Sequence, residues 1–189
     1  KRRPFWIMAG SDTTLASEYN WGGFQINSTE GTLTIITEDA DASSMRRNAT
    51  AATLNTDAGF STLMTSTARR KNPDVTVRFR VNTTVTRRVW IGWTEADHMS
   101  LDSSAATHKF ALRLSTSPAV TGFTIVHSDG TTETVEAQIQ ASNALIHTIR
   151  LIADDANTRW GYSFDGAAIV WITTNIPTTA QVMGFQCQI

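Results

Sequence analysis

The sequence predicts an all-β fold, a sandwich or barrel of short antiparallel strands, and three observations point to it. Thr is the most frequent residue and β-branched types dominate the apolar runs, which favours pleated, half-buried surfaces over helices. From residue 75 onward, apolar and polar residues alternate along several runs, as they do in strands with one buried face. Asp-Gly pairs at 129–130 and 165–166 fall between such runs, where hairpin turns are expected.

The first third of the chain is the least regular part. Residues 32–37 (TLTIIT) and 60–65 (FSTLMT) are predicted strands. Between them, residues 38–59 are polar and rich in Ala, Ser and Thr, without helical periodicity. We expect a long exposed loop there. Residues 1–31 are expected to form an N-terminal arm or extension.

Regular strands are predicted from residue 75 to the end. Residues 75–82 (VTVRFRVN) and 108–115 (HKFALRLS) alternate with period two. Residues 122–139 are expected to form two strands joined at Asp129-Gly130, and residues 146–172 three strands, with a loop at 154–157 and a turn at Asp165-Gly166. The last residues alternate again around Cys187, which is expected to be a buried thiol.

Composition limits the function classes. The chain has 189 residues with a net charge of −1 and a pI near 6.5, so no overall field attracts nucleic acid or an anionic membrane. We therefore predict one domain over residues 1–189 that binds neither. A single cysteine excludes an intrachain disulfide. The first residues (KRRPFWIMAG) lack an initiator Met, so a segment of a longer or processed chain is expected.

The order of segments from residue 60 to 189 resembles a known family. A strand, Phe164-Asp165-Gly166, a second strand and then Ile176-Pro177 are similar to the close of the concanavalin-like, laminin-G-like jelly-roll sandwich. The version found in fibres, spikes and capsid decorations of tailed phages and archaeal viruses is also similar. The resemblance implies a two-sheet antiparallel jelly roll of the lectin and glucanase kind.

Glycoside hydrolases belong to the same family, and residues 95–100 test this function. Their catalytic strand carries Glu-x-Asp-x-Glu, or a bulged form with one more residue, which aims carboxylates into one cleft. Glu95 and Asp97 match the first half of the motif, but Met99 and Ser100 stand where the second Glu must be. Without that acid, the sequence predicts that the chain is not an enzyme and has no catalytic residues.

Two acidic segments are candidates for a calcium site, since Ca²⁺ takes six to eight oxygen ligands. The candidate ligands are Glu95, Asp97 and Asp102 in the first segment, and Asp154, Asp155 and Asn157 in the second. Neither segment has a diagnostic ligand spacing, and acidic residues at strand ends usually face water. No cofactor is predicted, and Ca²⁺ is the one cation that these residues suggest.

Aromatic side chains are candidates for an exposed contact with a glycan or a neighbouring subunit. Trp21 is flanked by glycines in YNWGGF, which predicts a turn that exposes Trp21 and Tyr19. Trp90 and Trp93 point to opposite faces of a regular strand, so at most one of them is expected to meet solvent. Trp93 is the third candidate contact.

Two functions from different classes fit these features. The first is a non-enzymatic structural protein of a virus particle, a capsid decoration or a domain of a head fibre, tail fibre or spike. Such a protein would lie on the virion surface or outside the cell and assemble with other virion proteins and with copies of itself, as a homo-oligomer, with a trimer favoured. The second is a lectin-like module that binds cell-surface glycans.

Overall fold

The computed structural model describes the chain in several ranges. These are residues 18–21, 24–27, 32–37, 44–49, 59–62, 67–68, 72–81, 88–95, 107–115, 122–154, 156 and 158–188. In the strands before residue 72 the backbone alone is described. Every element of regular secondary structure in these ranges is a β-strand, so the predicted all-β class is confirmed. In the described part of the chain, no helix has the length and apolar character needed to cross a membrane.

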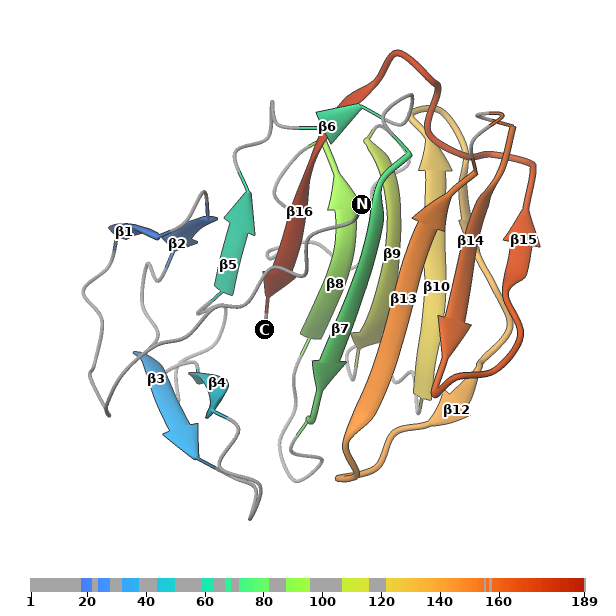
Figure 1. Cartoon of the computed structure of the whole chain (residues 1–189). Helices are drawn as coiled ribbons and strands as arrows, with labels where there is room; N and C mark the ends of the chain where they lie inside the picture. The colour runs from blue at the N-terminus through green and yellow to red at the C-terminus, as the bar shows by residue number, and fades with distance from the viewer. Residues whose placement is uncertain are drawn as a thin grey trace.

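A large antiparallel sheet forms one layer (Figure 1). Its strands, in spatial order, are β1 (Glu18–Trp21), β2 (Phe24–Asn27), β5 (Gly59–Thr62), β16 (Val182–Gln188), β8 (Arg88–Thr94), β9 (His108–Ser115), β10 (Gly122–Asp129) and β11 (Glu133–Val135). Two short strands pair off this path, β12 (Gln140–Ala141) with β10 and β6 (Thr67–Ala68) with β16. Because β16 inserts between β5 and β8, the last described strand lies inside the sheet.

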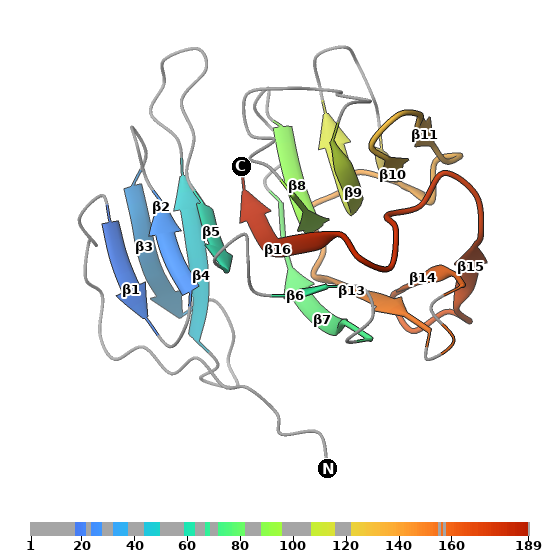
Figure 2. The same cartoon turned by 90° about the horizontal axis from the view of Figure 1, so that it is seen from above.

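A smaller antiparallel sheet forms the second layer, as the view from above shows (Figure 2). Its strands, in order, are β15 (Val170–Ile172), β14 (Trp160–Phe164), β13 (His147–Ala153) and β7 (Asp74–Phe79). A separate hairpin pairs β3 (Thr32–Thr37) with β4 (Ser44–Ala49). The two layers form the predicted antiparallel sandwich.

The core lies between the layers because each strand turns alternate residues inward. In the large sheet the register aligns Phe185, Trp93 and Phe110 in one row across β16, β8 and β9. In the small sheet Trp160 is fully buried, and its indole stacks on the ring of Phe110 with centroids 5.0 Å apart. Such aromatic pairs add to the free energy gained by burying apolar area, so this stack ties the sheets together.

Buried His147, at the start of β13, is hydrogen-bonded on both ring nitrogens. Nδ1 lies 2.7 Å from Oδ2 of Asp165, and Nε2 lies 2.9 Å from Oδ1 of Asn143. The amide oxygen of Asn143 also accepts the N–H of Leu145, so it faces the imidazole as an acceptor. The imidazole also lies 5.1 Å from the ring of Phe164, so hydrogen bonds and a ring contact together fix its orientation.

His127, in the middle of β10, is buried and paired in the same way. Its Nδ1 lies 3.0 Å from the carbonyl oxygen of Asn175, and its Nε2 lies 2.9 Å from Oε1 of Glu136. Asn175 has a positive φ of 49°, and its side-chain amide donates to the hydroxyl of Thr134. The histidine therefore joins the segment after β15 to the β10–β11 edge.

One region of the first third differs from the prediction, and the N-terminal region contains strands that were not predicted. The segment 38–59, predicted as a loop, contains β4, whose Arg46 pairs with Ile35 of β3. The predicted arm 1–31 contains β1 and β2, which extend the large sheet through β5. Strand pairing uses backbone N–H and C=O groups, so a polar segment joins a sheet without the alternation that makes a strand visible in the sequence.

Asp165 makes the free energy of unfolding of the sandwich depend on pH in the acid range. Burial alone would raise the pKa of Asp165, but the hydrogen bonds from the Thr148 N–H and from His147, with the charge of His147, lower it below the ordinary 3.8. A depressed folded pKa contributes stability that is present above the unfolded value and lost as pH falls through the folded value. Unfolding by urea at pH values from about 2 to 5 is expected to show a weaker acid dependence in Asp165→Asn than in the wild type. Parallel curves would contradict this role.

Candidate functional site

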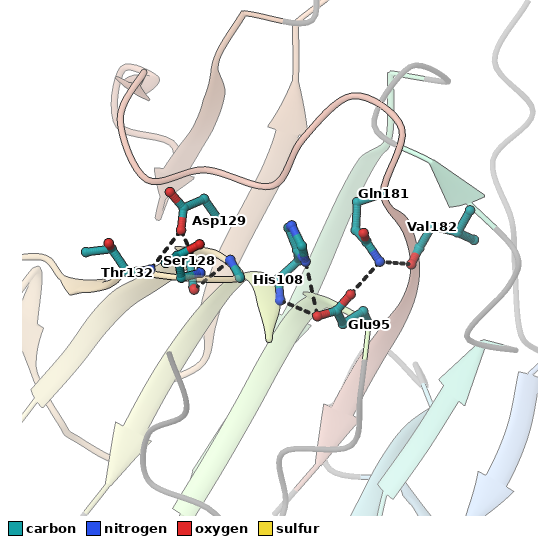
Figure 3. Close-up of polar contacts among 9 residues, drawn as sticks. Glu95, His108, Ser128, Asp129, Thr132, Gln181 and Val182 are labelled. Atoms are coloured by element: carbon teal, nitrogen blue, oxygen red, sulfur yellow. Dashed lines mark hydrogen bonds and ion pairs between the residues drawn. The ribbon is translucent and has the colours of Figure 1, made fainter. Parts of the chain in front are cut away.

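A polar cluster lies where β8 ends and β9 begins, and Glu95 is its centre (Figure 3). The Glu95 N–H donates to the carbonyl of His108 (3.1 Å), and the His108 N–H donates to Oε1 of Glu95 (2.8 Å). Nδ1 of His108 lies 3.1 Å from the same oxygen, although the angle there is poor for a hydrogen bond. Gln181, just before β16, donates its Nε2–H to Oε2. Both oxygens of Glu95 are thus engaged in joining three strand ends.

Asp129 lies on the other side of His108, since the two are Cα partners in the β9–β10 pair. Hydrogen bonds from the N–H groups of Thr132 and Thr131, each 2.8 Å long, lower the pKa of Asp129, and the charge of His108 adds to this effect. Gly130 has a φ of 87°, and a Cβ there would lie 2.5 Å from the imidazole. The turn therefore closes directly onto the histidine, which lies between two carboxylates.

Most of the predicted calcium ligands cannot be placed in the structure. Asp97, Asp102, Asp155 and Asn157 lie outside the described residues. Asp154, after β13, accepts the N–H and hydroxyl of Thr158 and is used in its own turn. Within the described ranges, no three His, Cys, Asp or Glu side chains form a group that could hold a metal ion. The calcium hypothesis stays a prediction for the residues outside these ranges.

The predicted aromatic contacts have different outcomes. Trp93 is 8% exposed and packs edge-on against Phe185, so it is a core residue and not an exposed contact. Trp90 and Trp93 point to opposite faces of β8, as predicted, and Trp93 is the one on the inner face. Tyr19 and Trp21 lie in β1, whose side chains are not described, so their contact remains a prediction.

The outer face of the large sheet, which we call the polar face, was not found from the sequence. Its rows are set by the register. They consist of Trp90, Arg113 and Thr124; of Gln186, Gly92, Ala111, Val126 and Val135; and of Gly184, Thr94, Lys109, Ser128 and Glu133. An outward sheet face is usually solvated, yet most of these side chains are buried.

Two contacts organise the polar face. The guanidinium of Arg113 lies over the indole of Trp90, 5.6 Å from the ring centroid. Lys109, with 0% exposure, forms an ion pair with Glu133 across β10. Burial lowers the pKa of Lys109, Glu133 acts to raise it, and the charge of Arg113 lowers it further. The face therefore holds two cations in a region shielded from water, where charge interactions are strong.

The middle row of the polar face has two residues without a long side chain, Gly92 and Ala111, as Cα partners. A Cβ at Gly92 would lie 2.4 Å from Cα of Ala111, so only glycine fits at this point. The row reaches solvent at β11, where Val135 is 46% exposed. A signal for this face was present in HKFALRLS, since Lys109 and Arg113 share the side opposite the apolar residues, but alternation alone predicts a solvated side.

The fold belongs to the class of concanavalin-like jelly-roll sandwiches, as the sequence predicted. No family model and no protein of curated function matches the sequence. Among solved structures, a carbohydrate esterase of the Shiga toxin-encoding bacteriophage phi24B is similar at 12% identity, with a TM-score of 0.58 over 94% of this chain and 90% of that chain. A Bacillus licheniformis β-glucanase (11% identity, 96% and 85% covered, TM-score 0.48) and a lichenase from a mouse hindgut metagenome (10%, 90% and 69%, 0.45) are more distant.

The prediction that the chain is not an enzyme is wrong. The sandwich that it shares is the fold of a carbohydrate esterase, so one incomplete glycosidase motif at Glu95 and Asp97 does not exclude catalysis. The similarity establishes the fold and assigns no activity or catalytic residue to this chain.

The ion pair of Lys109 and Glu133 gives a testable asymmetry in stability. Glu133→Gln is expected to lower the free energy of unfolding by about 3 kcal/mol, because a buried ammonium loses its carboxylate. The double variant Lys109→Met/Glu133→Leu is expected to stay within about 1 kcal/mol of the wild type, because both charges are gone. Urea unfolding followed by circular dichroism measures both. A double variant that is less stable than Glu133→Gln would contradict this description of the pair.

Proposed function

We propose that the protein recognises carbohydrate and that a saccharide binds on the polar face of the large sheet. The observation that carries the proposal is the burial of hydrogen-bonding side chains, among them Lys109 and Gln186, on the face turned away from the core. Burying polar groups costs free energy. Buried polar side chains at a position where apolar ones would be more stable therefore indicate a function. Recognition sites need such groups, because shielded donors and acceptors fix the orientation of a ligand.

A ligand would reach the polar face from its exposed edge at β11. The side chains of Trp90, Lys109 and Thr94 are buried, so they shape the face from beneath, and Arg113, at 7% exposed, is the more exposed of its two cations. A saccharide has both apolar C–H faces and hydroxyl groups, so it matches a surface that combines the two. The exposed end of the row at Val135 is where a chain would enter.

The fold similarity supports the choice of ligand. The bacteriophage protein with the same sandwich is described as a carbohydrate esterase. The match covers 94% of this chain and 90% of that chain. A carbohydrate ligand is therefore the first class to test for this chain. Whether recognition is followed by cleavage is measured in the same experiment.

The proposal includes a place of action. We propose a domain displayed on a virus particle, on the virion surface or outside the cell, where glycans of the host are met. The bacteriophage source of the similar structure supports this setting. Displayed domains of this kind assemble as closed symmetric oligomers, so copies of this chain and other virion proteins are the proposed partners.

Binding to a glycan array, followed by calorimetric titration of each saccharide that binds, tests the ligand class. Arg113→Met is expected to weaken binding about tenfold, because a hydrogen bond to a charged group is lost. Arg78→Met is the matched control, since Arg78 is exposed on the small sheet. Released reducing ends and acetate, measured on the same mixtures, report cleavage.

Two outcomes would overturn the proposal. If no saccharide of the array binds the folded wild-type chain, carbohydrate recognition is wrong. If a saccharide binds and Arg113→Met and Arg78→Met have equal effects, the polar face is not the site. Circular dichroism of each variant confirms that a loss of binding is not a loss of fold.

The oligomeric state tests the proposed setting. Native mass spectrometry of the purified chain is expected to show a closed trimer, since decorations and fibres of virus particles occupy symmetry axes. The trimer is expected to persist on dilution to low micromolar concentration. A monomer at every concentration would contradict display as a self-assembled trimer.

A further inference from the structure

The outer face of the small sheet carries a half-buried indole, that of Trp171, which lies against the neighbouring strand. Trp171 of β15 is the Cα partner of Gly161 in β14. Its neighbour Ile172 points into the core, so Trp171 points to the outer face of the sheet. A Cβ at Gly161 would lie 2.7 Å from Cε3 of the indole and 2.7 Å from Cγ2 of Ile169. The absence of a side chain at Gly161 therefore lets the ring settle against β14.

Arg159 lies over this ring. Its guanidinium carbon is 4.2 Å from the centroid of the Trp171 ring, closer than the 5.6 Å of the buried Arg113 and Trp90 pair. The side chain of Arg159 is 44% exposed. A cation held on an indole and open to water is able to meet a ligand without any rearrangement of the chain.

The carboxylate of Asp154 holds the guanidinium of Arg159 through its Nε atom. Nε of Arg159 lies 3.3 Å from Oδ2 of Asp154. Asp154 is itself fixed by the N–H groups of Thr158 and Arg159 and by the Thr158 hydroxyl. Among the described residues, no hydrogen bond reaches the terminal Nη1 and Nη2 atoms of Arg159. These two donors present the planar edge that binds carboxylates and sulfates in pairs of hydrogen bonds.

The surroundings favour an anionic ligand. Arg150, on the neighbouring strand β13, is already paired with Asp74 through two bonds of 2.9 Å. Arg78 of β7 and Arg80, which follows this strand, are two further exposed arginines. The chain as a whole carries a charge of −1, so this face differs from the average surface in presenting cations.

We propose that Arg159 and Trp171 form a second carbohydrate contact, separate from the polar face, that binds the acidic group of a charged saccharide. The terminal nitrogens of Arg159 hold the carboxylate or sulfate, and Trp171 is a positioning residue that fixes the plane of the guanidinium. This inference rests on the proposed carbohydrate function and names the class of saccharide. The two contacts lie on opposite layers of the sandwich (Figure 2), so one polymer chain on a surface could not occupy both without wrapping around the domain.

The test uses a chondroitin sulfate hexasaccharide, which carries carboxylate and sulfate groups, and its desulfated, carboxyl-reduced form as the neutral probe. Arg159→Gln is expected to weaken binding of the acidic probe about tenfold, the effect of losing a charge-assisted pair of hydrogen bonds. Binding of the neutral probe is expected to be unchanged. In the wild type, the acidic probe is expected to shift the indole N–H resonance of Trp171, assigned from the spectrum of Trp171→Phe.

Arg80→Gln is the matched control, because it removes one positive charge from the same face without touching the indole. Equal losses in Arg80→Gln and Arg159→Gln would reduce the effect to general attraction and overturn the inference. So would an acidic probe that binds the wild type but loses its affinity in Arg113→Met and not in Arg159→Gln, because the acidic group would then bind at the polar face. If neutral saccharides bind and the acidic probe does not, this inference fails and the proposed function stands. If no saccharide binds, both fail.

Discussion

The register between β8 and β9 fixes what each face of the large sheet contains. Pairing Trp93 with Phe110 turns both rings toward the small sheet, where Phe110 meets Trp160. The same pairing turns Trp90 and Arg113 to the opposite face. A shift of one residue would exchange the two faces completely. It would place a lysine in the core, so the aromatic row that stabilises the sandwich also holds the polar face in order.

The inner and outer faces of the large sheet are both largely buried, but burial has a different effect on the free energy of each. The inner face gains free energy from apolar area removed from water, and its rings pack in close contact. The outer face contains a shielded ammonium at Lys109 that costs free energy and is compensated by Glu133. Glu95, one position beyond Thr94, follows the parity of the inner face and joins strand ends. Glu95, the described residue of the half-motif, therefore lies on the other side of the sheet from the polar face.

The sequence was sufficient where a strand has one apolar face. Residues 75–82, 108–115 and 146–172 alternate, and the structure has β7, β9, β13, β14 and β15 there. It was insufficient for β4, whose pairing depends on backbone groups, and for the polar face, because a buried polar residue and a solvated one look the same in a pattern. Lys109 shows this limit. Only the register, which places Glu133 across β10, reveals that its charge is buried.

The two arginine–tryptophan pairs show how one contact type serves different purposes. Arg113 on Trp90 is buried, so its charge interacts in a medium of low polarity and affects stability. Arg159 on Trp171 is exposed and is held by the turn at Asp154, so its substitution removes little packing. Because the two pairs lie on different sheets, changes in one leave the register of the other intact. A sandwich of this kind can therefore vary its chemistry on the outer faces while the inner rows keep the fold, which agrees with a shared architecture at 12% identity.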